Sequence, residues 1–253
     1  DVPWSRLHDL PAVLVTGSGL SETRDGGYAE YARLESRWVV ALPAGLGLRE
    51  SMILGTAGFT AALALLRMED NRQTPGIGPL AVTGATGGVG SLAIAIFSKA
   101  GYEVHAISGK ADQAGYLTSL GASEVLGRDA LSTTRPMDAA RFGGGLDNVG
   151  GPMLAALLAQ TAPYGNVASA GLAASHELHA TVMPFIIRGV SLLGVASAGT
   201  ARDLRDEVWR RLSSDWKPVG LDTICTRETG LDGLQAVFET MLAGGSLGRT
   251  VVR

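Results

Sequence analysis

Residues 83–90, Thr-Gly-Ala-Thr-Gly-Gly-Val-Gly, have the residue types and spacing of a phosphate-binding turn. Glycines let the backbone approach a pyrophosphate, and the first amides of a helix that follows favour negative charge. Glycine-rich turns alone are weak evidence. Here, however, a short apolar strand precedes the turn and an apolar helix continues to residue 99. A second strand over residues 102–108 completes the order, so we expect Thr86, Gly87, Gly88 and Val89 at a dinucleotide pyrophosphate.

The end of that second strand indicates which dinucleotide binds. NAD sites usually carry Asp or Glu about 20 residues beyond the glycines, where the carboxylate accepts from the ribose hydroxyl. This chain has Ser108, Gly109 and Lys110 there instead. A carboxylate would repel a 2′-phosphate, whereas a hydroxyl, a glycine amide and a lysine would bind it. We therefore expect NADPH rather than NADH; taken alone, Lys110 is also compatible with a solvated residue at a helix start.

Composition bounds the class of protein. The 253 residues include 21 Lys and Arg, 24 Asp and Glu and a single cysteine, with a net charge of −3. No broad basic face for nucleic acid or anionic lipid follows from this balance. One cysteine excludes internal disulfides and a cysteine-cluster zinc site. The longest apolar run, residues 54–66, is too short to span a bilayer. We expect a cytoplasmic protein with no membrane or nucleic-acid partner.

The elements that position the turn alternate between strand and helix. We expect strands near residues 80–84, 103–108, 123–126, 145–149, 165–169 and 190–195, and helices near residues 88–100, 111–120, 151–160 and 182–187. This alternation predicts an α/β fold, a Rossmann-type doubly wound parallel sheet.

The two ends of the chain have a different pattern. Short strands near residues 12–16, 26–32 and 38–42 predict part of a small β domain over residues 1–47, and two helices, 49–54 and 59–69, follow. The dinucleotide-binding domain then covers residues 48–200. The last segment, residues 201–253, is expected to return to the β domain. Its predicted elements are a helix at 201–214, a strand at 219–226, a helix at 231–243 and a strand at 248–253.

Several segments resemble the zinc-free quinone reductases of the medium-chain dehydrogenase/reductase family, and most closely the NADPH-dependent acrylyl-CoA reductase branch. The matching segments are residues 25–31, 53–61, 82–90, 108–110, 117–122, 146–150, 181–188 and 248–252. The resemblance implies that residues 1–47 are a partial GroES-like catalytic domain. The family normally begins with more of that domain, including an Asn-Tyr element beside the nicotinamide, so we expect this chain to be a fragment.

The resemblance also implies further cofactor contacts. It places Thr56 and Thr60 at the start of a helix that faces the nicotinamide, Gly171 and Leu172 near the nicotinamide ribose, and Arg249 within reach of the 2′-phosphate. The alternatives are a helix cap, a strand-to-loop exit and a surface arginine. From their positions alone, Asn148, Val195 and Ser197 end strands at the ligand edge of the sheet. Tyr116 follows Lys110 by about one helical turn or more and is a candidate for the adenine or the 2′-phosphate.

The function expected from this resemblance is NADPH-dependent reduction of an activated carbon–carbon double bond, by hydride transfer to the β-carbon. The small-molecule substrate would be an enoyl-CoA such as acryloyl-CoA. The alternatives are a quinone or enone oxidoreductase, or a fragment that binds NADPH without catalysis. No catalytic residue or metal ligand stands out. Short-chain dehydrogenases share the glycine pattern, but no tyrosine here has their lysine partner. The resemblance also implies a homodimer, through the strand at residues 190–195, and an unpaired apolar edge strand is otherwise an aggregation hazard.

Overall fold

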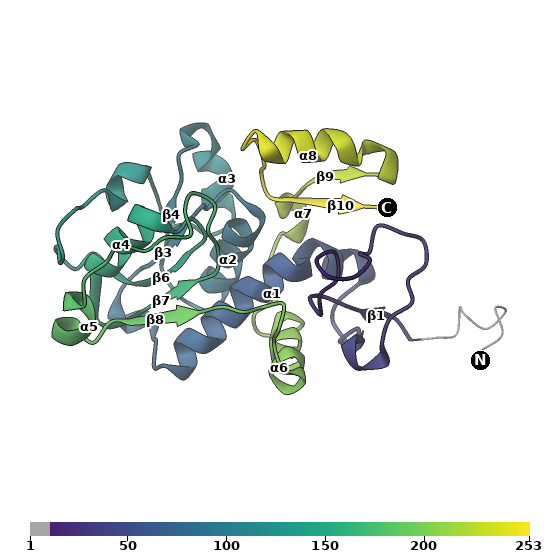
Figure 1. Ribbon diagram of the computed structural model, residues 1–253, viewed down its shortest axis with the longest axis horizontal. Helices are drawn as coiled ribbons and strands as arrows, with labels where there is room; N and C mark the ends of the chain where they lie inside the picture. The colour runs from purple at the N-terminus through teal and green to yellow at the C-terminus, as the bar shows by residue number, and fades with distance from the viewer. Residues whose placement is uncertain (1–10) are drawn as a thin grey trace.

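A six-stranded parallel sheet forms the centre of the computed structural model, which describes residues 11–253 (Figure 1). The strand order is β5-β4-β3-β6-β7-β8, so the sheet continues in opposite directions from β3. The strands are β3 (Leu80–Thr83), β4 (Val104–Ile107), β5 (Glu124–Leu126), β6 (Phe142–Asp147), β7 (Thr161–Ser169) and β8 (Ser191–Gly194). All six predicted strands and the doubly wound arrangement are confirmed.

Helices cover both faces of this sheet, which has a separate apolar core on each side. Leu80 and Val82 of β3 face the core shared with α1 (Leu48–Asp70), α2 (Gly88–Lys99) and α3 (Ala114–Ser119). Between them, Ala81 faces the core shared with α4 (Gly151–Ala159). Alternate side chains of a strand point to opposite faces, and a strand buried on both faces is apolar throughout. The remaining helical elements of this region are α5 (Met183–Arg188), η3 (Pro75–Ile77), η4 (Ala111–Gln113) and η5 (Arg128–Leu131).

The two helices predicted at residues 49–54 and 59–69 follow each other directly in one 23-residue element, α1, with a kink between them. Its backbone leaves helical geometry only at Gly55, with φ 48° and ψ −152°, so the predicted gap is a one-residue break. α1 is long and apolar enough to cross a membrane, whereas the apolar run at residues 54–66 was judged too short from the sequence. However, 83% of the most apolar stretch of α1 is buried inside the protein. α1 is a core helix, and Figure 1 shows it running along the middle of the molecule.

The amino-terminal segment contains less sheet than predicted. β1 (Val13–Leu14) and β2 (Val40–Ala41) form a two-stranded antiparallel sheet, and η2 (Ser36–Trp38) precedes β2. The strand predicted at residues 26–32 is wrong, because that segment is irregular and largely exposed. Its alternation of Tyr28 and Tyr31 with small residues looked like a strand, but both rings are exposed.

The carboxy-terminal segment consists of α6 (Arg202–Leu212), α7 (Leu221–Ile224), β9 (Cys225–Thr229), η6 (Leu231–Gly233), α8 (Leu234–Leu242) and β10 (Arg249–Val252). α6 packs into the main core through Val208, Trp209 and Leu212, whereas β9, α8 and β10 form a small carboxy-terminal unit on the other side of α1 (Figure 1). β9 and β10 pair in parallel with each other rather than with β1 or β2. The strand predicted at 219–226 is wrong in its first half: Leu221 and Ile224, three residues apart, are buried from one turn of helix. The division at residues 47 and 200 stays a prediction.

Candidate functional site

A cavity of about 1050 Å³ lies at the carboxyl ends of the central strands. Its walls come from the segments that follow β3, β4, β5, β6 and β7, together with Gly244 and Ser246 of the loop before β10. The sheet reverses its order between β3 and β6, and open α/β sheets bind ligands at such a point. Ten of the predicted cofactor residues line this cavity. They are Thr86, Gly87, Gly88, Val89, Ser108, Gly109, Lys110, Asn148, Gly171 and Leu172.

The glycine-rich turn joins β3 directly to α2. Gly87 donates from its amide to the carbonyl of Gly84 at 3.0 Å, and α2 begins at Gly88. A Cβ at Gly90 would lie 2.4 Å from the Gly84 carbonyl oxygen, so only glycine allows the helix to start this close to the strand. The turn therefore directs the amino-terminal end of α2 into the cavity, where an anion is favoured.

Asp147, which the sequence interpretation did not identify, ties the turn to the next strand. Its carboxylate accepts from the Thr83 hydroxyl at 2.8 Å and from the Gly150 amide at 2.7 Å. Burial raises the pKa of Asp147, and the same hydrogen bonds oppose that shift. The Thr83 oxygen also accepts from the Asn148 amide at 2.9 Å. This network fixes the ends of β3 and β6 relative to each other.

Asn148 and Gly171 lie side by side at the ends of β6 and β7. The Asn148 side chain donates to the Thr83 carbonyl at 2.8 Å. A Cβ at Gly171 would lie 2.5 Å from the Asn148 carbonyl oxygen, so the two backbones approach closely. Leu172 follows, with 66% of its surface exposed. This wall offers an apolar side chain and backbone groups rather than charge.

Basic side chains gather at the other end of the cavity, beyond β4 and β5. Ser108 is buried, and its hydroxyl accepts from the Lys110 amide at 3.0 Å. The Lys110 ammonium donates to the Ser246 carbonyl at 2.7 Å. The guanidinium of Arg128 lies against Gly109, with Nε 2.5 Å from where a Cβ would stand. No Asp or Glu is found among the described residues that line this cavity.

Arg128 was also missed by the sequence interpretation. The sequence did carry a signal for it: Arg128 comes two positions after β5, the neighbour of the strand that leads to Ser108. Parallel strands end at the same edge of a sheet, so the two residues are expected close together. The strand itself was predicted, but the basic residue after it was not considered as a ligand. Together Ser108, Lys110 and Arg128 can hold a phosphate group, since both cations donate hydrogen bonds to phosphate oxygens.

The other six predicted residues do not line this cavity. Thr56 is exposed on α1. The hydroxyl of the buried Thr60 donates to the backbone carbonyl of Thr56 at 2.7 Å. The Tyr116 hydroxyl donates to Ser91 at 2.9 Å. The Val195 amide is bound to the Ser169 carbonyl at 3.0 Å.

The last two of the six are Ser197, between β8 and α6, and Arg249 of β10. The Ser197 carbonyl accepts from Thr200 and Arg205, and Arg249 lines a second cavity. Their roles toward a cofactor stay predictions, as does the role of the ten residues in the main cavity.

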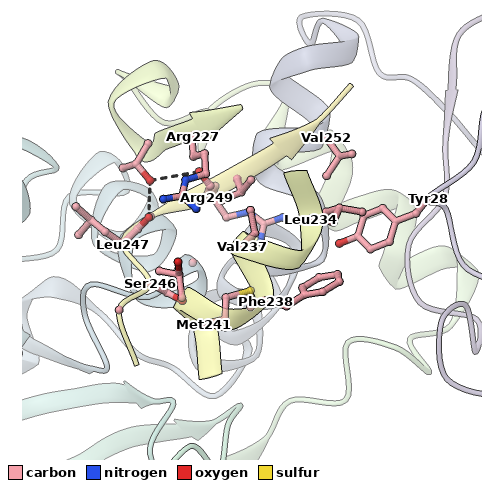
Figure 2. Close-up of a pocket in the computed structure, with 16 residues that line it drawn as sticks. Tyr28, Arg227, Leu234, Val237, Phe238, Met241, Ser246, Leu247, Arg249 and Val252 are labelled. Atoms are coloured by element: carbon pink, nitrogen blue, oxygen red, sulfur yellow. Dashed lines mark hydrogen bonds between the residues drawn. The ribbon is translucent and has the colours of Figure 1, made fainter. Parts of the chain in front are cut away.

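The second cavity, of about 300 Å³, lies between α8, β9 and β10. Figure 2 shows Tyr28 reaching it from the amino-terminal segment, with its ring toward Phe238. The two ring centroids are 6.4 Å apart. Gly88 and Ser246 line both cavities, so the loop before β10 separates them.

Other basic and metal-binding candidates have different partners. Lys217 pairs with Glu50, Arg210 with Glu207, and Arg211 with Asp215 and Glu69. Within residues 11–253, no group of three or more His, Cys, Asp or Glu is placed to hold a metal ion. His8 lies outside the described residues.

Comparisons with known proteins agree with this geometry. Residues 88–214 match a family model described as zinc-binding dehydrogenase. YhfP of Bacillus subtilis, which carries the name of a quinone oxidoreductase, is 44% identical over 250 residues, or 98% of this chain and 76% of YhfP. Its crystal structure with NAD bound has a TM-score of 0.93, covering 95% of this chain and 74% of that one.

Two further relatives carry other names and ligands. The acrylyl-CoA reductase AcuI of Ruegeria pomeroyi is 43% identical over 242 residues, or 95% of this chain and 73% of AcuI. The crystal structure of Escherichia coli YhdH with bound NADPH has a TM-score of 0.91 and 44% identity, covering 95% of this chain and 74% of that one. The chain thus spans about three quarters of its relatives. It belongs to the medium-chain dehydrogenase/reductase family, in the oxidoreductase branch of the acrylyl-CoA reductases and quinone oxidoreductases.

Proposed function

We propose that this protein is an NADPH-dependent reductase of an activated carbon–carbon double bond, with an α,β-unsaturated acyl-CoA such as acryloyl-CoA as substrate. The observation that carries the cofactor choice is the basic, carboxylate-free end of the main cavity. This end is formed by Ser108, Lys110 and Arg128. No carboxylate among the described residues of the cavity wall balances the two cations, and a 2′-phosphate would do so. The name of AcuI supports the substrate, and the crystal structure of YhdH with bound NADPH supports the cofactor.

The residues present fit a dinucleotide along the whole cavity. The first turn of α2 receives the pyrophosphate, the basic end receives the adenosine 2′-phosphate, and the Asn148–Gly171 wall receives the nicotinamide ribose. Lys110 is bound to the Ser246 carbonyl, so binding requires its ammonium to exchange that acceptor for the phosphate. The bond to Ser246 holds the Lys110 side chain in place before the cofactor binds, which lowers the conformational entropy lost on binding.

When bound, NADPH supplies a hydride, which in this proposal reaches the β-carbon of the thioester. The enolate oxygen that develops needs hydrogen-bond donors, and backbone amides or hydroxyls at the open end of the cavity can provide them. This chain's contribution is to orient the cofactor and to keep the reacting end away from carboxylates that would oppose the enolate charge.

The test is NADPH oxidation with acryloyl-CoA, followed at 340 nm, with NADH as the paired cofactor. Turnover with NADPH and little with NADH is the expected result. Equal rates with both cofactors would contradict the 2′-phosphate site. YhfP, whose crystal structure has NAD bound, serves as a comparison protein in the same assay with both cofactors.

The quinone or enone reductase is the second candidate, and the name carried by YhfP favours it. A benzoquinone series in the same assay decides between the two substrates, because a thioester reductase is expected to prefer acryloyl-CoA in kcat/KM. A chain that binds NADPH but turns over neither substrate would support the non-catalytic alternative.

We also propose that two copies associate through β8. This strand is the edge of the central sheet, and one of its sides has no strand partner among the described residues. Exposed apolar side chains occur on β8 itself, at Leu192, and on the preceding helix α5, where Ile186 is 76% and Ile187 60% exposed. A second β8 running antiparallel would continue the sheet across a two-fold axis and cover these side chains.

A further inference from the structure

Next to the break in α1, the backbone carbonyl of Ile53 accepts a hydrogen bond from a side chain outside the helix. In a continuous helix the Ile53 carbonyl accepts from the amide four residues later. At Gly55, φ is 48° and ψ is −152°, which interrupts that pattern. Arg249 of β10 donates to the Ile53 carbonyl oxygen, with its Nε 3.0 Å from that atom. A residue almost two hundred positions away in the sequence is therefore bonded to the backbone of the turn that contains the break.

The same side chain also touches the start of α2. Its Nη2 lies 2.8 Å from where a Gly55 Cβ would stand, and its Cδ and Nη1 lie 3.0 and 3.3 Å from where a Gly88 Cβ would stand. Both glycines are needed for this approach. Arg249 thus sits between the break in α1 and the first residue of the helix that faces the pyrophosphate.

The environment of this guanidinium is unusual for a cation. Burial lowers the pKa of Arg249, and the groups that oppose the shift are Tyr28 and Cys225 rather than carboxylates. The amino-terminal end of α2 adds positive potential close by. A partly buried cation without a carboxylate partner is unfavourable unless hydrogen bonds compensate for its lost hydration.

We propose that Arg249 is a positioning residue, which holds the second half of α1, beginning at Thr56, in a fixed relation to the Gly88 end of the pyrophosphate turn. The proposal rests on the proposed dinucleotide function. It replaces the expectation that Arg249 binds the 2′-phosphate: Lys110 and Ser108 line the main cavity, whereas Arg249 lines the second one with Tyr28 and Phe238 (Figure 2).

The first test measures affinities for NADPH and NADH by fluorescence titration, in the full chain and in Arg249→Met. A positioning residue affects the part common to both cofactors, so both dissociation constants should rise by a similar factor, several-fold or more, and their ratio should stay unchanged. Lys110→Met is the matched control, in which only NADPH should weaken. A selective loss of NADPH in Arg249→Met would overturn the proposal in favour of a 2′-phosphate contact.

Unchanged affinities with a lowered Tm would also overturn it, because Arg249 would then serve stability alone. Should Arg249→Met not fold, Arg249→Lys keeps the charge and the stem while losing the Nε donor, and the same ratio decides. Binding by the wild type without turnover of acryloyl-CoA would refute the proposed reaction but leave this test intact.

A second test uses the sign of a substitution. Gly55→Ala should lower Tm in the wild type, because alanine is strained at this positive φ and its Cβ meets Arg249. In Arg249→Met the break loses its support and α1 can become continuous, so the same substitution should raise Tm. Amide hydrogen exchange at residues 54–58 should slow in the double variant. A destabilising Gly55→Ala of equal size in both backgrounds would show that Arg249 does not hold the break.

Discussion

At the scale of single residues, Asp147 makes the strongest case for a side chain that the sequence did not reveal. Both carboxylate oxygens accept hydrogen bonds, from Thr83 and from the Gly150 amide. The residue is fully buried and is followed by two glycines with positive φ, Gly150 and Gly151. Its position as the last residue of an apolar strand made it resemble an ordinary exposed strand end.

Asp147→Asn should destabilise the protein by about 1–3 kcal/mol, because an amide nitrogen replaces one of two acceptors in a buried network. With the amide nitrogen toward Gly150, two donors face each other; with it toward Thr83, the hydroxyl can accept from the amide but loses the acceptor for its own proton. Urea denaturation measures the difference. Asp112→Asn, on the exposed η4, is the control and should change stability by less than about 0.5 kcal/mol. Equal stability of the two variants would contradict the role of the network.

Ser108→Asp should reverse the cofactor preference. Asp can still accept from the Lys110 amide, so the turn is kept, but its charge opposes a 2′-phosphate and suits a free ribose hydroxyl. The KM for NADPH should rise at least about tenfold, equivalent to about 1.4 kcal/mol, while the KM for NADH falls. Ser108→Asn is the neutral control. A variant that still prefers NADPH as strongly as the wild type would argue against phosphate binding beside Ser108.

Most of the cavity wall could be predicted from the sequence because its residues follow strands and share one edge of the sheet. Glycines 87 and 88, Ser108 and Asn148 are of this kind. Arg128 was missed although it follows a predicted strand, and Ser246 could not be placed, since its approach depends on where a distant loop lies in space. Arg249 was assigned by resemblance, whereas its contacts with Gly55 and Gly88 depend on tertiary packing.

At the scale of elements, the close start of α2 behind β3 is the feature that the site depends on. Gly90→Ala should destabilise the chain and abolish cofactor binding, because the new Cβ would lie 2.7 Å from the Ala85 Cα as well as against the Gly84 oxygen. Gly115→Ala is the matched control within α3, where a Cβ meets nothing within 4 Å. It should stabilise by up to about 1 kcal/mol. Thermal melts with and without NADPH compare the two variants.

The start of α1 provides a pH-dependent contribution. Glu50 accepts from the Gly47 amide at 2.9 Å and pairs with Lys217 at 2.7 Å, and these contacts, the Gly47 bond first, lower the pKa of Glu50 from 4.5. A lowered folded-state pKa stabilises the protein above the ordinary value, and the gain is lost as the pH falls through the shifted pKa.

Glu50→Gln should therefore cost less than about 1 kcal/mol at pH 7, since the pair is partly solvent-exposed. The difference from the wild type should shrink below pH 4.5, where the carboxyl becomes protonated. Urea denaturation at pH 7 and at pH 4 measures both values. A difference that stays constant between these pH values would mean that the charge of Glu50 plays no part.

The alternating part of the chain was predictable by element because each apolar strand and helix is buried on a definite face. The two ends were not. At residues 26–32 a strand-like alternation has no neighbouring strand to pair with, and at residues 221–224 a strand-like composition folds as one helical turn. Pairing partners and single helical turns are set by tertiary contacts rather than by local pattern.

At the scale of the whole molecule, buried polar contacts connect segments far apart in the sequence. Arg205 of α6 is 5% exposed and donates to the Thr16 carbonyl and hydroxyl at 2.9 Å. The Cζ atom of Arg205 lies 4.9 Å from the centroid of the Phe59 ring on α1. Arg205 thus joins three parts of the chain: the amino-terminal segment, the core helix α1 and the carboxy-terminal segment. It holds both ends of the chain against the central domain.

The proposed association through β8 makes the last prediction. If two sheets join, the side chains around β8 are covered in the dimer, so a charge placed there must be desolvated or must separate the copies. Ile186→Glu and Leu192→Lys should therefore shift the protein from dimer to monomer in sedimentation velocity at micromolar concentration. Both residues are exposed in one copy, so the fold of each copy should survive.

Leu242→Glu supplies the control for this experiment. Leu242 is 89% exposed on α8, in the carboxy-terminal unit rather than beside β8, so this variant should remain dimeric. A wild type that sediments as a monomer would refute the association outright. A dimer that persists in Ile186→Glu and Leu192→Lys but dissociates in Leu242→Glu would move the interface from the edge of the central sheet to α8, where Phe238 and Met241 are also partly exposed.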